Sequence, residues 1–176
     1  DPWKDPFGVI TAYQIAKKKV PGLQLALVGS LAGDDPEGWQ IYAAIHDEAN
    51  KDPDISVFSN LTGVGNMEVN AFQTAADIVL QKSIKEGFGL VVAEALWKKT
   101  PMIAGNAGGI PMQMSGNLSD YLVNSVEECA EKIVYIFENP HVSEKLGGEG
   151  KENIRKNFLT PRLIKDELAL IKRLVK

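Results

Sequence analysis

Short apolar runs alternate with longer amphipathic stretches along the chain. The runs are continuous, which is typical of strands buried on both faces of a parallel sheet. They predict strands at residues 23–28, 55–58, 78–81, 101–104 and 120–123. The longer stretches predict helices at residues 5–19, 35–50, 66–76, 125–139, 142–158 and 161–175, and one more after the turn that contains Glu86. Alternation of this kind predicts an α/β fold, a Rossmann-like, doubly wound parallel sheet with helices on both faces.

The ends of the predicted elements carry local signals. Asp5 and Asp35 each precede a proline, which is a good start for a helix. Ser125 begins a capping box, and Thr160 is expected to cap the last helix. A doubly wound fold usually has about six strands, and the chain opens at Asp1 in what would be the loop after the first, central strand. We therefore expect that first strand to be omitted here or supplied by another segment.

Glycine-rich loops are concentrated at one edge of the predicted sheet. Ligands bind beyond the carboxyl ends of parallel strands, at the point where the strand order reverses. The loops at that end are residues 29–30 (Gly29 and Ser30), 60–65, 83–89 and 105–111, and three of the four are rich in glycine. The asymmetry predicts a ligand site at this edge.

The stretch from residue 83 to residue 96 combines two carboxylates with the start of a helix. Glu86 lies in the turn, and the backbone amides that follow it are the unpaired donors of a helix N-terminus, which attract phosphate. The amides belong to Gly87, Phe88, Gly89 and Leu90. Glycine has no Cβ, so a ligand can approach the backbone closely.

Glu94 lies on an apolar stripe of the predicted helix, together with Leu90 and Trp97. A carboxylate on such a stripe needs hydrogen-bond partners, because burying it alone costs several kcal/mol. Adjacent hydroxyls of a polyol ligand would be suitable partners. The tryptophans Trp39 and Trp97 are expected to lie in the core.

Charge and cysteine content exclude several classes of protein. The chain of 176 residues suits one domain, and its 19 Lys and Arg against 23 Asp and Glu argue against a nucleic-acid binder. The one cysteine, Cys129, is expected to be a buried apolar residue in a cytoplasmic protein. His46 and His141 are far apart, so no protein metal site is expected. No apolar run has the roughly 20 residues of a membrane span, and no signal peptide is expected.

Three further features have weaker interpretations. Residues 60–66 imitate the start of a dinucleotide fingerprint, but Glu68 occupies the third glycine position and disfavours NAD binding. Gly147 and Gly148 lie in a helical pattern with the wrong spacing for a phosphate loop, and we expect a kink or a close packing contact there. Lys4 is either a solvated loop lysine or the best available cation for a phosphate at the sheet edge.

Residues 86–96, Glu-Gly-Phe-Gly-Leu-Val-Val-Ala-Glu-Ala-Leu, resemble the E-x7-E signature of retaining nucleotide-sugar glycosyltransferases with the GT-B fold, group 1 or family 4. The resemblance runs from Lys4 to about Phe158 and covers the C-terminal, donor-binding half of that fold. Residues 1–6, 35–39, 64–73 and 81–86 are similar to the subgroup of trehalose synthases and trehalose phosphorylases.

The resemblance implies a retaining transfer of glucose from ADP-glucose or UDP-glucose to glucose, which gives trehalose. The alternatives are a trehalose phosphorylase, which uses orthophosphate and α-glucose 1-phosphate, and a non-catalytic nucleotide-sugar-binding module. The acceptor would bind through an N-terminal domain that is not in this chain, so the domain alone, residues 1–176, is expected to be inactive. The helix within 159–176 is expected to pack toward that domain. No cofactor or metal, no nucleic acid and no membrane is implied, and a homodimer is possible.

The resemblance also implies roles for individual residues. Lys4 would hold the donor diphosphate and Glu86 would bind the donor sugar and steady charge at its anomeric carbon, as the two catalytic groups. Glu94 would accept hydrogen bonds from the ribose hydroxyls. The remaining donor-binding residues would be Gly29, Ser30, Gly87, Phe88, Gly89 and Leu90. Gln113 fits the family pattern, but residues 117–120 replace its usual second glycine, which puts the geometry of that loop in doubt.

Overall fold

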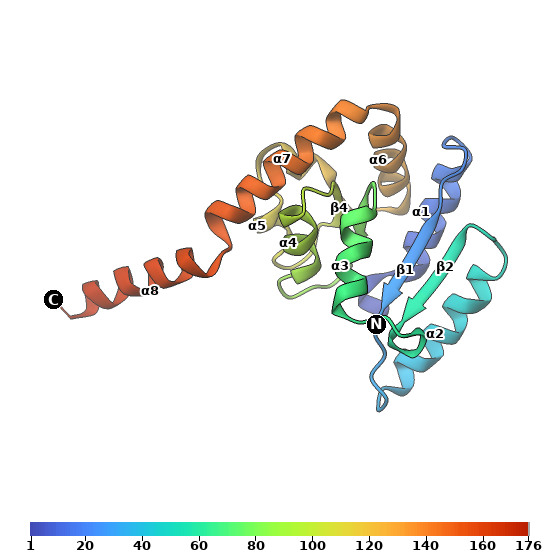
Figure 1. Ribbon diagram of the computed structural model, residues 1–176, viewed down its shortest axis with the longest axis horizontal. Coiled ribbons are helices and arrows are strands. Elements are labelled where there is room, and N and C mark those ends of the chain that lie inside the picture. Colours follow the sequence, from blue (N-terminus) through green and yellow to red (C-terminus); the bar gives the residue numbers. More distant parts are fainter. Residues whose placement is uncertain (176) are drawn as a thin grey trace.

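The computed structural model describes residues 1–175, and its strands form two parallel ladders (Figure 1). In the first ladder, β1 (Leu25–Gly29) pairs with β2 (Ile55–Ser59). In the second, β3 (Val79–Gln81), β4 (Met102–Gly105) and β5 (Leu122–Val123) lie side by side in that order. Helices lie on both sides of the sheet, so the predicted α/β class with a parallel sheet is confirmed.

The predicted long helices are all present, with ends that differ by a few residues from those expected. They are α1 (Pro6–Lys17), α2 (Pro36–Ala49), α3 (Asn66–Ala75), α4 (Leu90–Trp97), α6 (Val126–Glu138), α7 (Pro140–Asn157) and α8 (Thr160–Leu174). The glycine-rich loop after β4 contains the short α5 (Ile110–Gln113), and three 3-10 turns complete the fold: η1 (Pro2–Lys4), η2 (Asn60–Thr62) and η3 (Gly116–Tyr121). The last strand is shorter than predicted because η3 occupies its first residues.

The helix starts follow the predicted caps, with one exception. The carboxylates of Asp5 and Asp35 accept from backbone amides three residues later, at 3.1 and 3.0 Å, and Ser125 Oγ accepts from the Glu128 amide at 3.1 Å. The predicted capping box is only half formed, because the Glu128 carboxylate accepts from the Asn124 amide at 2.6 Å rather than from Ser125. The expectation that Thr160 caps α8 is wrong. The extended residue Leu159 takes that place, because its carbonyl already accepts from the Arg162 amide at 2.9 Å.

The main core lies around β4 and joins α1, α4, α6 and α7. Its fully buried members include Val92, Leu96, Ile103, Met114 and Cys129. Burial raises the pKa of the Cys129 thiol to about 11, so this residue is the buried apolar cysteine that was expected. A smaller cluster joins α1 to the first ladder through Ile10, Tyr13, Ala49 and Ile55.

The two tryptophans predicted for the core are instead at the surface, where 41% of Trp39 and 40% of Trp97 is exposed. Helix α4 is apolar on two sides, and it buries Val92, Ala95 and Leu96. Trp97 therefore lies outside, where the Lys151 ammonium covers its ring at 4.7 Å from the centroid.

Helix α8 leads away from the body of the domain (Figure 1). It is amphipathic, and no residue of it is buried. Its large apolar side chains are all at least half exposed: Leu163, Ile164, Leu168, Leu170, Ile171 and Leu174. No helix in residues 1–175 combines the length and apolar character needed to cross a membrane.

The two adjacent glycines of α7 have opposite surroundings, which gives a matched pair of variants. A Cβ on Gly147 would lie 2.0 Å from the Lys99 carbonyl oxygen, whereas a Cβ on Gly148 would meet nothing within 4 Å. This confirms close packing, and α7 continues without a break.

We expect Gly147→Ala to lower the free energy of unfolding by about 1–3 kcal/mol through overpacking. Gly148→Ala should leave it unchanged or raise it by up to ~1 kcal/mol through helix propensity. Urea unfolding of both variants is the measurement, and equal effects would contradict the packing argument.

Candidate functional site

The carboxyl ends of the strands bring the N-terminal turn against the loop after β3. The Ile84 amide donates to the Trp3 carbonyl oxygen at 2.9 Å, and the Lys85 ammonium lies 4.7 Å from the centre of the Trp3 ring. The turn η1 is closed by Asp1, whose carboxylate accepts from the Trp3 amide at 2.9 Å. These contacts place Lys4 over the loop that carries Glu86.

Lys4 and Glu86 form one ion pair, through Lys4 Nζ and Glu86 Oε2. The same carboxylate oxygen accepts from Ser83 Oγ at 3.2 Å and from Gln81 Nε2 at 3.3 Å, and the other oxygen accepts from the Gly87 amide at 3.1 Å. Burial on its own would raise the pKa of Glu86, but the Lys4 ammonium and these hydrogen bonds outweigh it and hold the pKa below its usual value. Glu86 is therefore a carboxylate at neutral pH.

Lys4, the predicted cation for the phosphate, is thus paired with Glu86, the predicted sugar-binding carboxylate. The Lys4 side chain remains 44% exposed, whereas that of Glu86 is 11% exposed. An arriving anion would therefore reach the ammonium from the solvent side and share it with Glu86. Sequence reasoning assigned the two residues separate roles and missed this contact.

A second ion pair, which the sequence analysis also missed, lies just behind the first. Lys82, at the end of β3, is buried and pairs with Asp5. Asp5 also caps α1 and has the left-handed backbone conformation, with φ of 51°. Because an unpaired buried ammonium is costly, this pair fixes the backbone next to Lys4.

The glycines of the site serve mainly to bring two loops together. The Gly109 amide donates to the Gly87 carbonyl oxygen at 2.7 Å, and a Cβ on Gly108 would lie 1.8 Å from the Glu86 carbonyl oxygen. Gly89 has φ of 83°, and a Cβ there would lie 2.9 Å from Ile110 Cγ1. Of Gly87 and Gly89, Gly87 is the open one, with nothing within 4 Å of its Cβ position, so the predicted close approach of a ligand is possible there.

The N-terminus of α4 offers free donors beside Glu86. Within residues 1–175, the backbone amides of Phe88, Gly89 and Leu90 donate to no protein acceptor. The buried Gln113 side chain donates to the Phe88 and Gly89 carbonyl oxygens and so holds this turn from beneath. Unpaired amide donors at the N-terminus of a helix suit an anion.

Glu94 is held on the outer side of α4 by a chain of polar contacts. Its Oε2 accepts from Gln73 Nε2 at 2.9 Å, and Gln73 Oε1 in turn accepts from Lys98 Nζ at 2.8 Å. Thr100 Oγ1 donates to the Gln73 carbonyl oxygen at 2.6 Å. Glu94 itself is exposed, as are Leu90 and Trp97, so the predicted stripe exists but faces solvent. Gln73 is 6% exposed, and its role was not foreseen.

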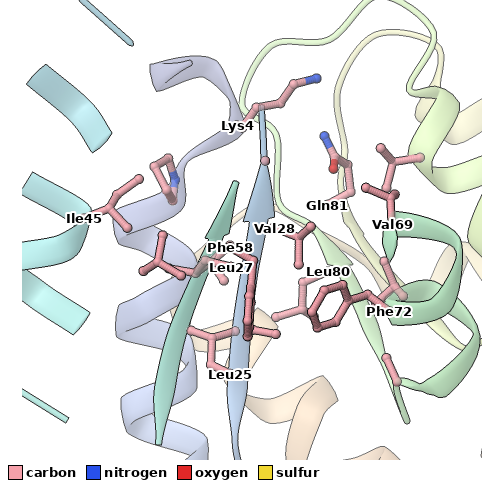
Figure 2. Close-up of a pocket in the computed structure, with 18 of the residues that line it drawn as sticks. Lys4, Leu25, Leu27, Val28, Ile45, Phe58, Val69, Phe72, Leu80 and Gln81 are labelled. Atoms are coloured by element: carbon pink, nitrogen blue, oxygen red, sulfur yellow. The ribbon is translucent and has the colours of Figure 1, made fainter. Parts of the chain in front are cut away.

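A cavity lies beside Lys4. It measures about 810 Å³ and lies between β1 and β3 (Figure 2). Lys4, Gly29 and Ser30 line it, whereas Glu86, Glu94 and residues 87–90 do not. The predicted site residues are therefore divided. Three line the cavity, Glu86 contacts one of these, Lys4, and the others belong to α4 and to the turn before it. In residues 1–175 no three His, Cys, Asp or Glu side chains are grouped to hold a metal.

Comparisons with known proteins show the family to which this chain belongs. The model of "Glycosyl transferases group 1" matches residues 1–153. The chain is 51% identical over 175 residues to trehalose synthase of Rubrobacter xylanophilus, an alignment that covers 99% of this chain and 42% of that protein. It is 30% identical over 145 residues to trehalose phosphorylase of Pleurotus pulmonarius, covering 72% of this chain and 20% of that protein. The chain thus spans about two fifths of the length of the trehalose synthase and about one fifth of the length of the phosphorylase.

A solved structure agrees with these sequence matches. The C-terminal domain of a group 1 glycosyl transferase from Francisella tularensis superposes with a TM-score of 0.75 at 24% identity, covering 91% of this chain and 82% of that one. At that identity the likeness concerns the fold.

Proposed function

This chain belongs to the group 1 glycosyl transferases, and we propose that it is the donor-binding domain of an enzyme that transfers glucose from a nucleotide diphosphate glucose to glucose, with retention, and so forms trehalose. The observation that carries the proposal is the free helix N-terminus of α4 with a carboxylate on each side of it. Glu86 is ionised before the helix, and Glu94 is exposed one turn into it. A diphosphate at the amides would lie between a sugar and a ribose, and each carboxylate would accept hydroxyl hydrogen bonds.

The donor-side groups are assigned by their contacts. The diphosphate would accept from the amides of Phe88, Gly89 and Leu90 and from Lys4, which is exposed enough to turn from Glu86 toward it. Glu86 would then bind a sugar hydroxyl and stabilise the positive charge that develops at the anomeric carbon in the transition state. The leaving diphosphate would take the acceptor proton. Catalysis on this account consists of positioning and electrostatics.

The acceptor half of the reaction is assigned to polypeptide outside this chain. The trehalose synthase of Rubrobacter xylanophilus is more than twice as long as its match to this chain, and α8 presents an uncovered apolar face. We propose that this face packs against an N-terminal acceptor domain, and that the enzyme acts in the cytoplasm without a cofactor. The domain by itself would then bind donor and transfer nothing.

Calorimetric titration identifies the donor. The chain is titrated with UDP-glucose, ADP-glucose, α-glucose 1-phosphate and orthophosphate in parallel. We expect one of the two nucleotide sugars to bind, and neither glucose 1-phosphate nor orthophosphate to compete at equal concentration, because they lack the ribose that Glu94 would bind. A phosphorylase is the alternative to test, because the chain is also similar to the Pleurotus phosphorylase. Binding of glucose 1-phosphate and orthophosphate alone would favour a phosphorylase, and binding without transfer by the full-length protein would favour a non-catalytic module.

A further inference from the structure

Three consecutive peptide groups at the start of α4 carry the free amides beside Glu86. They are the peptides Gly87–Phe88, Phe88–Gly89 and Gly89–Leu90, and within residues 1–175 their N–H groups donate to no protein acceptor. Each of these peptide bonds is trans. In a planar trans peptide the C=O and N–H groups point in opposite directions. The direction of each free N–H group is therefore set by whatever holds the carbonyl of the same peptide.

All three carbonyls accept hydrogen bonds from one short segment, residues 109–113, which contains α5. The Gly109 amide donates to the Gly87 oxygen at 2.7 Å. The Gln113 side chain donates to the Phe88 oxygen and, at 3.3 Å, to the Gly89 oxygen. The Gly89 oxygen also accepts from the Val92 amide at 3.0 Å, whereas in the described part of the chain the Phe88 oxygen accepts from Gln113 alone. The orientation of the Phe88–Gly89 peptide thus depends on Gln113.

The Gln113 amide is an unusual group for the position it occupies. The residue is fully buried, and α7 holds its backbone, because Asn153 Nδ2 donates to the Gln113 carbonyl oxygen at 2.7 Å. Its Oε1 atom is buried and accepts from no group in residues 1–175. A buried acceptor without a partner costs free energy, so an apolar side chain of the same size would suit the packing at least as well. The two carbonyls to which Gln113 donates account for the amide.

The surroundings of Gln113 hold this contact in place. Helix α5 packs against α4, and α4 packs against α7 (Figure 1). A Cβ on Gly89 would lie 2.9 Å from Ile110 Cγ1, so the turn and α5 are in close contact. Donors that are already fixed need no rearrangement when an anion arrives, which is how backbone amides stabilise charge most effectively.

We propose that Gln113 is a positioning residue of the donor site, which turns the Phe88–Gly89 peptide so that the Gly89 N–H group points away from the core and binds the donor diphosphate. Gln113 itself would touch no atom of the donor. This role rests on the proposed function, because the anion is the diphosphate of the proposed donor. Without the Gln113 amide the Phe88–Gly89 peptide would be free to turn, and its carbonyl oxygen would then repel the phosphate.

The variant Gln113→Met tests this role, since it removes the amide and keeps an unbranched side chain that fills the space. In the full-length protein we expect it to weaken binding of UDP or ADP, whichever binds the parent, by about 10- to 100-fold, the effect of one hydrogen bond to a charged group. Uridine and adenosine have no phosphate, and their affinity in competition titrations should be unchanged. Equal losses for the nucleotide and its nucleoside would overturn the proposal.

Two further variants complete the binding test. Gln24→Met is the matched control, because Gln24 is an exposed glutamine at the opposite end of β1 from the site, and it should change neither affinity. Asn153→Ala keeps the Gln113 amide and removes its support from α7. It should give a smaller loss of the same kind, specific to the nucleotide, and it serves as the test if Gln113→Met does not fold. Unchanged nucleotide binding in both site variants would overturn the proposal.

Residual dipolar couplings of the ligand-free protein test the peptide orientation directly. Gln113→Met should change the N–H coupling of Gly89, whereas Phe88 should keep its coupling, because Gly109 still holds its peptide. The buried Ala95 of α4 is the reference. An unchanged Gly89 coupling would overturn the proposal whatever the protein binds. A parent protein that binds neither UDP nor ADP would overturn the proposed function instead, and the assigned orientation would still be decided by the couplings.

Discussion

Replacing Glu86 by glutamine is expected to lower the turnover of the full-length enzyme by about two to three orders of magnitude, the usual effect of removing one charge-stabilising group. The carboxylate is ionised and faces the carboxyl edge of the sheet, beside the free amides of α4. Glutamine keeps the shape and loses the charge. Donor affinity should be kept or improved, because Lys4 is released from its ion pair and becomes available to the diphosphate.

This split between turnover and binding distinguishes a catalytic role from a structural one. Initial rates and donor calorimetry on the same preparation are the measurements. Glu131→Gln is the matched control, since Glu131 is an exposed glutamate of α6, and it should change neither quantity. A Glu86→Gln enzyme that turned over normally, or that lost donor binding along with turnover, would contradict the role assigned to this carboxylate.

The strands were predictable because each is a short apolar run between layers of helices. The same reasoning overestimates the last one, whose predicted four residues become Leu122–Val123. Residues 116–121 form the 3-10 turn η3, so only Leu122 and Val123 pair with Ala104 and Gly105 of β4. An apolar run identifies a buried segment, but it does not show how much of that segment is extended.

Helix α4 shows a second limit of pattern reasoning. Its side chains are apolar on the stripe of Leu90 and Trp97 and also on the stripe of Val92, Ala95 and Leu96. A helix that is apolar on two sides does not indicate which side faces the core. Helix α4 packs against β4 and α7 through the stripe of Val92, Ala95 and Leu96. Glu94 therefore lies on the exposed side of the helix.

The motif residues were found by their spacing, whereas their supporting residues were not. Gln73 contacts Glu94 from a separate helix, 21 residues away in sequence. Lys82 meets Asp5 across 77 residues. Such contacts arise when elements pack together, and no short-range pattern contains them. A hint was available in Lys82, since a lysine at the end of a buried run must find a partner.

Glu94→Ala is expected to weaken nucleotide binding by roughly 10- to 100-fold. The carboxylate would accept from the ribose hydroxyls, and hydrogen bonds to a charged group contribute about 1.5–3 kcal/mol each, where 1.4 kcal/mol is tenfold in affinity. Because Glu94 is exposed, the thermal midpoint should stay near that of the parent chain. The measurement is calorimetric titration with whichever nucleotide sugar binds the parent.

A thermodynamic cycle that combines Glu94→Ala with a 2′,3′-dideoxyribose nucleotide shows whether the loss of affinity is due to the ribose hydroxyls. If Glu94 binds the hydroxyls, the parent chain should bind the 2′,3′-dideoxy nucleotide weakly, and Glu94→Ala should cost nothing further. Gln73→Leu should give part of the same loss, because it removes the donor that holds the carboxylate, while the Lys98 ammonium keeps the Glu94 carbonyl oxygen as an acceptor at 3.3 Å. An equal loss with the ribose and dideoxyribose nucleotides would place the effect of Glu94 elsewhere in the site.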